Sequence, residues 1–143
     1  VHEYERGEEL RDFGREAAEA LGLPFEQVFK TLLVDVAGGD RGDETVCVVV
    51  PVSCQVSMKS VAATVGAKKA SMCDPDAAER MTGYVVGGIS PLGQRKRLVT
   101  VLDETVELFD TIYVSGGRRG VDISLAPGDL VRLLDASIAA IST

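Results

Sequence analysis

A lysine interrupts an aliphatic segment in the first third of the chain. Residues 28–36 read VFKTLLVDV, and such a run of branched and aromatic residues predicts a β-strand. Alternate residues of a strand share a face, so Lys30 lies with the aliphatic residues at 28, 32, 34 and 36. Its stem can cover apolar surface while the ammonium reaches water. It can equally line a pocket, where it would hold a phosphate, a carbonyl oxygen or developing negative charge.

Two glycine-rich segments lie further along the chain. Residues 82–93 read TGYVVGGISPLG, which suits either a structural turn or a loop whose amides approach a ligand closely. The segment matches neither a nucleotide P-loop nor a hydrolase nucleophile elbow. Residues 115–120 read SGGRRG and directly follow a predicted strand. This second segment offers a hydroxyl, amides and cations together, or forms a tight hairpin with exposed arginines.

Conventional nucleophilic catalysis is difficult to build from this sequence. His2 is the only histidine and lies at the chain end, where fraying is common, so a catalytic triad or a Cys–His pair is not expected. The three cysteines, Cys47, Cys54 and Cys73, form no C-x-x-C pair, and with one histidine beside them a zinc site is not expected. We expect ordinary buried or half-buried thiols in a reducing cytoplasm.

The composition predicts one soluble domain over residues 1–143. Hydrophobic residues make up 45% and charged residues 26%, and no apolar run approaches the length of a membrane span. The net charge of −7 argues against a protein whose whole surface binds nucleic acid. Three basic clusters are either solvated surface or a local RNA-binding patch: Lys68 and Lys69; Arg95, Lys96 and Arg97; and Arg118 and Arg119. No export signal is visible after Val1.

Helix and strand signals are interspersed without a regular βαβ repeat. Helical spacing, caps and glycine stops predict helices over residues 8–21, 57–65 and 74–83 and a last helix that opens at Pro127. Strands are predicted over residues 28–36, 45–50, 98–102, 111–115 and 121–125. We therefore expect an α+β domain whose sheet curls around a pocket.

Three segments together resemble a known family. VFKTL at 28–32, TGYVVGGISPLG at 82–93 and IYVSGGRRGVDI at 112–123 closely resemble the YbaK family of bacterial Cys-tRNA(Pro) deacylases. The resemblance implies an α+β fold with a mixed, barrel-like sheet, shared with the editing domain inserted in bacterial prolyl-tRNA synthetases. It implies no cofactor and no metal. Members usually begin with a further helix and short strand, so this chain is expected to lack a short N-terminal segment.

The resemblance also assigns site residues. The family's lysine, G-x-x-P loop, pocket serine and pocket aspartate predict a catalytic set of Lys30, Gly88, Ser90, Ser115 and Asp122. We predict that the substrate is bound by Tyr4, Tyr84, Gly87, Ile89, Pro91, Gly116 and Gly117. The basic clusters are predicted to bind tRNA through Lys68, Lys69, Arg95, Lys96, Arg97, Arg118 and Arg119.

The activity implied is removal of cysteine from tRNA(Pro) by a reaction in which the substrate's own thiol attacks the ester. Aminoacyl-tRNA is the expected partner, with prolyl-tRNA synthetase as a second one, in the cytoplasm and without membrane or DNA. Three alternatives stay open: a deacylase for alanine or serine, a non-catalytic module that binds aminoacyl-tRNA or the synthetase, and a small-molecule binding protein.

Overall fold

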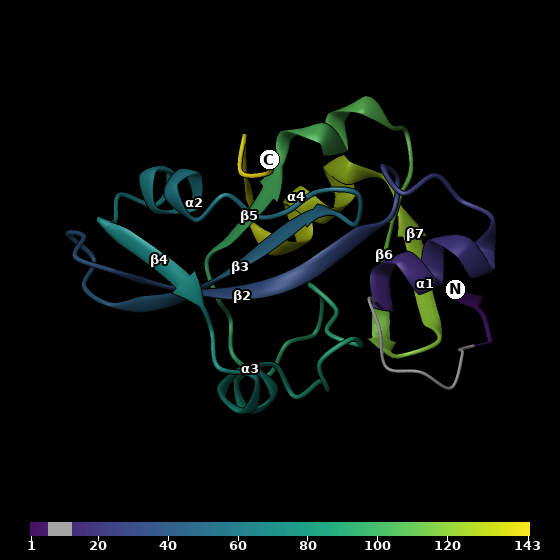
Figure 1. Cartoon of the computed structure of the whole chain (residues 1–143), viewed down its shortest axis with the longest axis horizontal. Coiled ribbons are helices and arrows are strands. Elements are labelled where there is room, and N and C mark those ends of the chain that lie inside the picture. Colours follow the sequence, from purple (N-terminus) through teal and green to yellow (C-terminus); the bar gives the residue numbers. More distant parts are fainter. Residues whose placement is uncertain (6–12) are drawn as a thin grey trace.

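Two β-sheets form the framework of the protein (Figure 1). The computed structural model describes residues 1–5 and 13–143. Its helices are α1 (Phe13–Leu21), α2 (Met58–Thr64), α3 (Pro75–Thr82) and α4 (Pro127–Leu134), with a 3₁₀ helix η1 (Glu104–Leu108). Its strands are β1 (His2–Glu3), β2 (Phe29–Ala37), β3 (Glu44–Pro51), β4 (Lys69–Met72), β5 (Thr100–Asp103), β6 (Ile112–Arg118), β7 (Val121–Leu125) and β8 (Ser137–Ala139).

The strand order confirms a mixed α+β fold. The larger sheet runs β4-β2-β3-β5-β8 and the smaller one β1-β7-β6. Pairing is parallel between β3 and β5 and between β5 and β8, and antiparallel elsewhere in both sheets. The expected barrel-like sheet is in fact two sheets, which do not close into a barrel within the described ranges.

Strand β2 is buried on both faces because its side chains alternate between two cores. Val34 and Val36 pack in one cluster with Val61 of α2. Leu33 packs in another with Ala78 of α3. The two helices therefore cover opposite faces of the larger sheet, and Figure 1 shows them on either side of it. The predicted alternation along this strand is confirmed.

The helix caps follow the sequence signals. The Ser57 side chain accepts a hydrogen bond from the Ser60 amide at the start of α2. Asp74 caps α3 in the same way, and Pro75 occupies its first turn. Gly83 ends α3 in the left-handed conformation, with φ of 81°. These signals fix the position of α3, which forms one wall of the site described below.

The shortest elements of the fold were not predicted from the sequence. Strands β1, β4 and β8 and the helix η1 were not predicted, because each is two to five residues long and is held by its neighbours rather than by its own pattern. Strand β6 runs on through Gly116 and Gly117, which were expected in a turn, with a register shift between Ser115 and Arg118. Residues 8–12 of the first predicted helix lie outside the described residues.

Candidate functional site

A cavity of about 280 Å³ lies along the edge of β2. Strand β4 pairs with this edge only from Val34 onward, and β6 reaches it only at Val28, which bridges to Tyr113. Between these two points, β2 has no neighbouring strand on this side among the described elements. The cavity is lined by Tyr4, Phe13, Gly14, Ala17, Val28, Phe29, Lys30, Thr31, Leu32, Leu33, Met72, Cys73, Pro75, Ala78, Val86, Gly87, Ile89, Ser115 and Asp122.

The open edge of β2 presents unused backbone groups. The Leu33 carbonyl accepts a hydrogen bond from the Cys73 amide on this edge, and the Val28 carbonyl accepts one from Val52 on the other. Because odd and even residues of a strand direct their N–H and C=O groups to opposite edges, those of Thr31 point to the open one. The Thr31 hydroxyl is also buried and has no hydrogen-bond partner among the described residues. The cavity wall therefore holds polar groups that a ligand could satisfy.

Lys30 lies in the cavity wall and is half-buried. Its ammonium forms no hydrogen bond or ion pair with any residue in the described part of the chain. The pocket-lining position, one of the two interpretations of this lysine, is thus the one observed. An uncompensated cation in a confined space favours an anionic or strongly polar ligand.

Asp122 supplies a buried carboxyl group to the same cavity. It lies on β7 directly opposite Ser115 of β6, and only 4% of its surface is exposed. Burial raises the pKa of Asp122 to about 7, and no cation among the described residues offsets this. A carboxyl group in this state can bind a cationic group or exchange a proton near neutral pH.

Ser115 and Tyr4 complete the polar wall. The Ser115 hydroxyl accepts a hydrogen bond from the Gly117 amide at 3.3 Å. The Tyr4 amide donates to the Gly120 carbonyl at 3.0 Å, which ties the N-terminal segment to the turn between β6 and β7. Tyr4, Lys30, Ser115 and Asp122, all from the predicted catalytic and substrate-binding sets, are therefore among the residues that line this cavity.

The glycine-rich loop between α3 and β5 closes another side. Gly87 and Ile89 line the cavity, whereas Gly88, Ser90 and Pro91 do not. Gly87 has φ of +88°, and a Cβ on it would lie 2.3 Å from the Phe13 ring. This close approach is available only to glycine. The Gly87 amide has no acceptor among the described residues.

Two predicted site residues brace this loop instead of lining the cavity. The Ser90 hydroxyl accepts a hydrogen bond from the Leu92 amide. The Tyr84 hydroxyl donates to the Leu92 carbonyl at 2.6 Å, and its ring packs against Gly117, where a Cβ would lie 3.0 Å away. Gly116 likewise packs against Val121, outside the lining.

The described residues of the cavity wall include no activated nucleophile. The His2 ring shares a hydrogen bond with the Ser124 hydroxyl and lies outside the lining. Cys73 lies in the wall, but burial and the nearby Asp35 carboxylate raise the pKa of its thiol to about 11, so it is protonated at neutral pH. All three cysteines are free and at least half-buried, as expected. Within residues 1–5 and 13–143, no group of three or more metal-ligating side chains is present.

Residues 8–133 match the family described as the aminoacyl-tRNA editing domain. The chain belongs to this family. It is 36% identical over 126 residues to EbsC of Enterococcus faecalis, which its name assigns as a Cys-tRNA(Pro)/Cys-tRNA(Cys) deacylase; the match covers 88% of this chain and 74% of EbsC. These findings confirm the family resemblance seen in the sequence motifs.

Two further proteins are similar to this editing domain, one in sequence and one in structure. The multifunctional Ser/Thr-tRNA deacylase ProXp-y of Escherichia coli K12 is 26% identical over 117 residues, covering 81% of this chain and 70% of that protein. A crystal structure described as a trans-editing enzyme for prolyl-tRNA synthetase superimposes with a TM-score of 0.79 at 24% identity, over 91% of this chain and 79% of that one. The second likeness shows the shared fold.

The predicted RNA-binding clusters of the editing domain have different surroundings. Arg95 and Lys96 are held against α3 by backbone hydrogen bonds to Thr82 and Met81. With Arg80 they line a groove of about 240 Å³ that also contains Ala77 and Met81. Arg80, Arg95, Lys96 and Arg97 form no ion pair in the described ranges.

The other two clusters are less available for phosphate. Lys69 lies in a hollow with the carboxylates Asp35, Asp43 and Glu44, and Lys68 precedes it. Arg118 is exposed and lies 3.7 Å from the Glu3 carboxylate. Arg119 donates a hydrogen bond from Nε to the Val86 carbonyl, so it is engaged inside the molecule.

Sequence reasoning missed several residues of the wall, notably Phe13, Thr31, Met72 and Ala78. Phe13 and Ala17 are four residues apart, so helical spacing placed them on one face, but nothing indicated that the face meets a cavity. Met72 belongs to β4, which was not predicted.

No helix of the described segments has the length and apolar character that a membrane span requires.

Proposed function

We propose that this editing domain removes cysteine from mischarged Cys-tRNA(Pro) and that the cavity beside β2 binds the acylated end of the tRNA. Membership of the editing family supports a deacylase, and the 36% identity to EbsC supports cysteine. The observation that carries the proposal is a single cavity whose described residues include a cation and a carboxyl group without ion-pair partners and a glycine-loop amide, but no activated nucleophile.

Asp122 is the proposed partner of the substrate's α-ammonium group. Its carboxyl is buried and forms no ion pair in the described part of the chain, and burial holds its pKa at about 7. Binding of an ammonium group would favour the carboxylate and offset its desolvation. The cavity of about 280 Å³ suits a small aminoacyl group and excludes a bulky one.

Lys30 and the backbone around it are the proposed binding groups for the ester and the ribose. The Thr31 and Gly87 amides lie in the cavity wall and have no acceptor among the residues that the structure describes, and such donors stabilise negative charge on a carbonyl oxygen. Lys30 would hold the terminal adenosine or its phosphate. In this arrangement the enzyme positions the reacting groups and stabilises charge without a covalent intermediate.

The proposed reaction uses the thiol of the bound cysteine. Its sulfur attacks the ester carbonyl carbon, the bond from that carbon to the ribose oxygen breaks, and the thiol proton ends on the departing ribose hydroxyl. The product is a cyclic thiolactone and free tRNA. Cys73 and Ser115 are poor substitutes as nucleophiles, because Cys73 is protonated and the Ser115 hydroxyl makes no hydrogen bond to a base.

The groove beside α3 is the proposed path of the RNA. Helix α3 contributes Ala78 to the cavity and Arg80 to the groove, so one helix diameter of about 10 Å separates the two. The three cations that line the groove, Arg80, Arg95 and Lys96, form no ion pair in the described part of the chain and offer a local phosphate site on a protein with a net charge of −7. Affinity from so small a patch is weak, which favours delivery of the tRNA by a partner such as prolyl-tRNA synthetase.

Serine is the second candidate substrate. The Thr31 hydroxyl is buried in the cavity wall with no partner in the described part of the chain, and a substrate hydroxyl would satisfy it. The 26% identity to a Ser/Thr-tRNA deacylase supports the same alternative. Serine has no thiol, so a water molecule would have to attack the ester.

Single-turnover deacylation of one tRNA(Pro) carrying cysteine, serine, alanine or proline separates the candidates. Substrate-assisted editing predicts that cysteine is released at least about 10²-fold faster than serine, since only the thiol can attack. Faster release of serine than of cysteine would identify serine, and not cysteine, as the substrate. Binding of the charged tRNA without release of any amino acid would identify a non-catalytic module and refute the proposal.

A further inference from the structure

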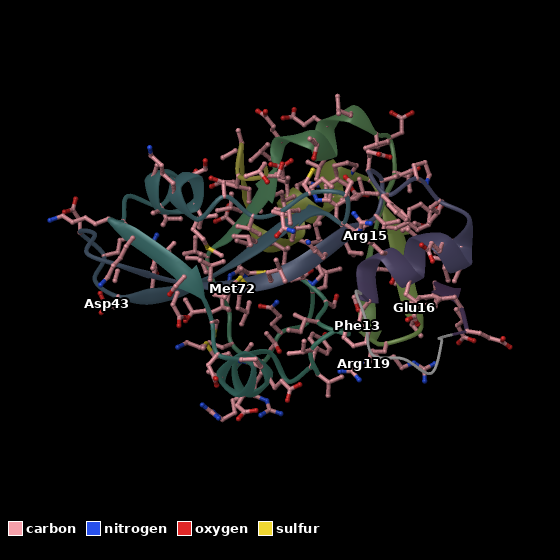
Figure 2. All side chains as sticks on the ribbon, viewed as in Figure 1. Phe13, Arg15, Glu16, Asp43, Met72 and Arg119 are labelled. Carbon is pink, nitrogen blue, oxygen red and sulfur yellow. The ribbon has the colours of Figure 1, made fainter. Side chains whose placement is uncertain are left out.

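Arg119 joins three segments that are distant in the sequence. Its Nε donates a hydrogen bond to the Val86 carbonyl at 2.8 Å. Its guanidinium lies over the Phe13 ring, 4.3 Å from the ring centroid. Figure 2 shows the Phe13 and Arg119 side chains next to each other below α1. The turn after β6, the glycine-rich loop and the start of α1 therefore meet at one side chain.

The groups that Arg119 contacts belong to the cavity wall. Phe13, Val86 and Gly87 all line it. The contact region is closely packed, because a Cβ on Gly87 would lie 2.3 Å from the Phe13 ring and one on Gly88 would lie 2.8 Å from the Arg118 and Arg119 backbone. Release of the arginine would therefore loosen this wall.

The hydrogen bond to Val86 also orients the next amide. The Val86 carbonyl and the Gly87 N–H belong to one planar peptide unit and point in opposite directions. Holding the carbonyl on the Arg119 side thus directs the Gly87 N–H away from Arg119, and this N–H has no acceptor among the described residues. Gly87 has a positive φ and little side-chain restraint, so without the arginine this peptide could rotate.

We propose that Arg119 is a positioning residue, which fixes the Phe13 ring and the Val86–Gly87 peptide so that the Gly87 amide meets the substrate carbonyl oxygen. This inference rests on the proposed function of the cavity. It differs from the sequence-based prediction that Arg119 binds tRNA phosphate. Only arginine can stack its planar group on an aromatic ring and donate through Nε together; lysine keeps the charge but not this geometry.

The neighbouring Arg118 provides a matched comparison. It has the same chemistry one residue earlier, but its side chain is 71% exposed, and its carboxylate partner Glu3 is 74% exposed. Such a surface pair contributes little to structure. Arg119→Ala, Arg119→Lys and Arg118→Ala therefore separate the internal contact from the positive charge.

The test is steady-state deacylation of Cys-tRNA(Pro) by these variants at two salt concentrations. We expect Arg119→Ala to lower kcat by roughly 10- to 100-fold and to change KM less than about threefold. The reason is that a Gly87 amide in the wrong orientation no longer stabilises the negative charge of the transition state. Arg119→Lys should not restore kcat. Arg118→Ala removes an exposed charge, so any change that it causes falls on KM and depends on salt. Wild-type kinetics in both Arg119 variants, or a salt-sensitive rise in KM that lysine restores, would overturn the positioning role.

Hydrogen exchange provides a readout that does not depend on activity. Amides of residues 84–90 should exchange faster in both Arg119 variants than in wild type, and at the wild-type rate in Arg118→Ala. Unchanged exchange in Arg119→Lys would overturn the contact itself, and this milder variant decides the question if the alanine variant fails to fold. If wild type releases no amino acid while this exchange difference is present, the proposed function fails and the structural contact stands.

Discussion

Two regions that contain lysine and aspartate side chains lie at opposite ends of strands β2 and β3, and these side chains have different environments. At one end lies the cavity, with Lys30, Asp122 and the loop carrying Gly87. At the other end the loop over residues 38–43 joins the strands beside a hollow of about 470 Å³, lined by Asp35, Asp43, Glu44 and Lys69 among others. Figures 1 and 2 place this loop and Asp43 at the end of the molecule opposite α1 and Phe13.

The two regions differ in whether their charged side chains have hydrogen-bond or ion-pair partners and in how deeply these side chains are buried. In the hollow, Asp35 accepts a hydrogen bond from Thr45 at 2.6 Å, and Glu44 pairs with Arg41 at 3.3 Å. In the cavity, Lys30 and Asp122 have no such partners in the described part of the chain, and Asp122 is nearly fully buried. Residue types alone therefore do not mark a site; polar groups held without partners in a confined space do.

Removal of the cavity lysine should have the largest effect. Lys30→Ala is expected to lower deacylation by at least about 10²-fold while the protein stays folded, because the cation that holds the RNA end is lost. Lys59→Ala, on the exposed surface of α2, serves as the control and should keep full activity. Full activity in a folded Lys30→Ala protein, judged by circular dichroism and single-turnover rates, would remove Lys30 from the mechanism.

The buried carboxyl group should make stability depend on pH. The folded pKa of Asp122, about 7, lies above its unfolded value, so the folded state binds more protons between about pH 4 and pH 7 and stability falls as pH rises through this window. Relative to wild type, Asp122→Asn should gain free energy of unfolding, on the order of 2–4 kcal/mol, between about pH 4 and pH 8.

Urea denaturation at a series of pH values measures this change. Asp43→Asn, in the exposed loop, is the control and should follow the wild-type curve. A wild-type curve parallel to that of Asp122→Asn across the whole range would show that this carboxyl titrates normally.

The loop over residues 38–43 and the loop that carries Gly87 should respond differently to a glycine-to-alanine substitution. Gly42 and Gly87 both have positive φ, but a Cβ at Gly42 meets nothing within 4 Å, whereas at Gly87 it meets the Phe13 ring. Gly42→Ala should cost about 1–2 kcal/mol of stability and leave kcat unchanged. Gly87→Ala should also lower kcat by roughly 10-fold or more. Equal kcat values in the two variants would separate this loop from catalysis.

Two threonines should give the smallest and opposite effects. Thr31 has a buried hydroxyl with no partner within residues 1–5 and 13–143, whereas the Thr45 hydroxyl donates to Asp35. Thr31→Val should raise the free energy of unfolding by about 1 kcal/mol, and Thr45→Val should lower it by a similar or smaller amount. Thermal denaturation of the two variants without substrate measures the difference. Destabilisation by Thr31→Val would indicate that the hydroxyl is already satisfied.

The sequence predicted the long elements of the fold better than the short ones. Strands β2, β3 and β7 and helices α2, α3 and α4 follow from alternation, helical spacing and caps such as Asp74 and Gly83. The edge strands β4 and β8 did not, because Lys69–Met72 and Ser137–Ala139 carry little pattern of their own and become strands by pairing with β2 and β5. The parallel pairing of β3 with β5 joins residues about fifty positions apart, which no local signal predicts.

The site was predictable where it depends on motifs. Lys30, Gly87, Ser115 and Asp122 were predicted from their segments and lie around one cavity, while their catalytic roles stay predictions. The cavity itself arises because β4 stops pairing before Thr31, a property of tertiary structure. Arg119 illustrates the same limit: next to Arg118 in sequence it looks like a surface cation, and only the fold brings it to Phe13.

The most direct test of the account is a crystal structure with a stable analogue of the substrate end, 3′-cysteinylamino-3′-deoxyadenosine. The account predicts the aminoacyl group in the cavity, its ammonium at Asp122, its carbonyl oxygen at the Gly87 amide and its adenosine beside Lys30. An analogue bound elsewhere, with the Lys30 ammonium directed into bulk solvent, would contradict the account.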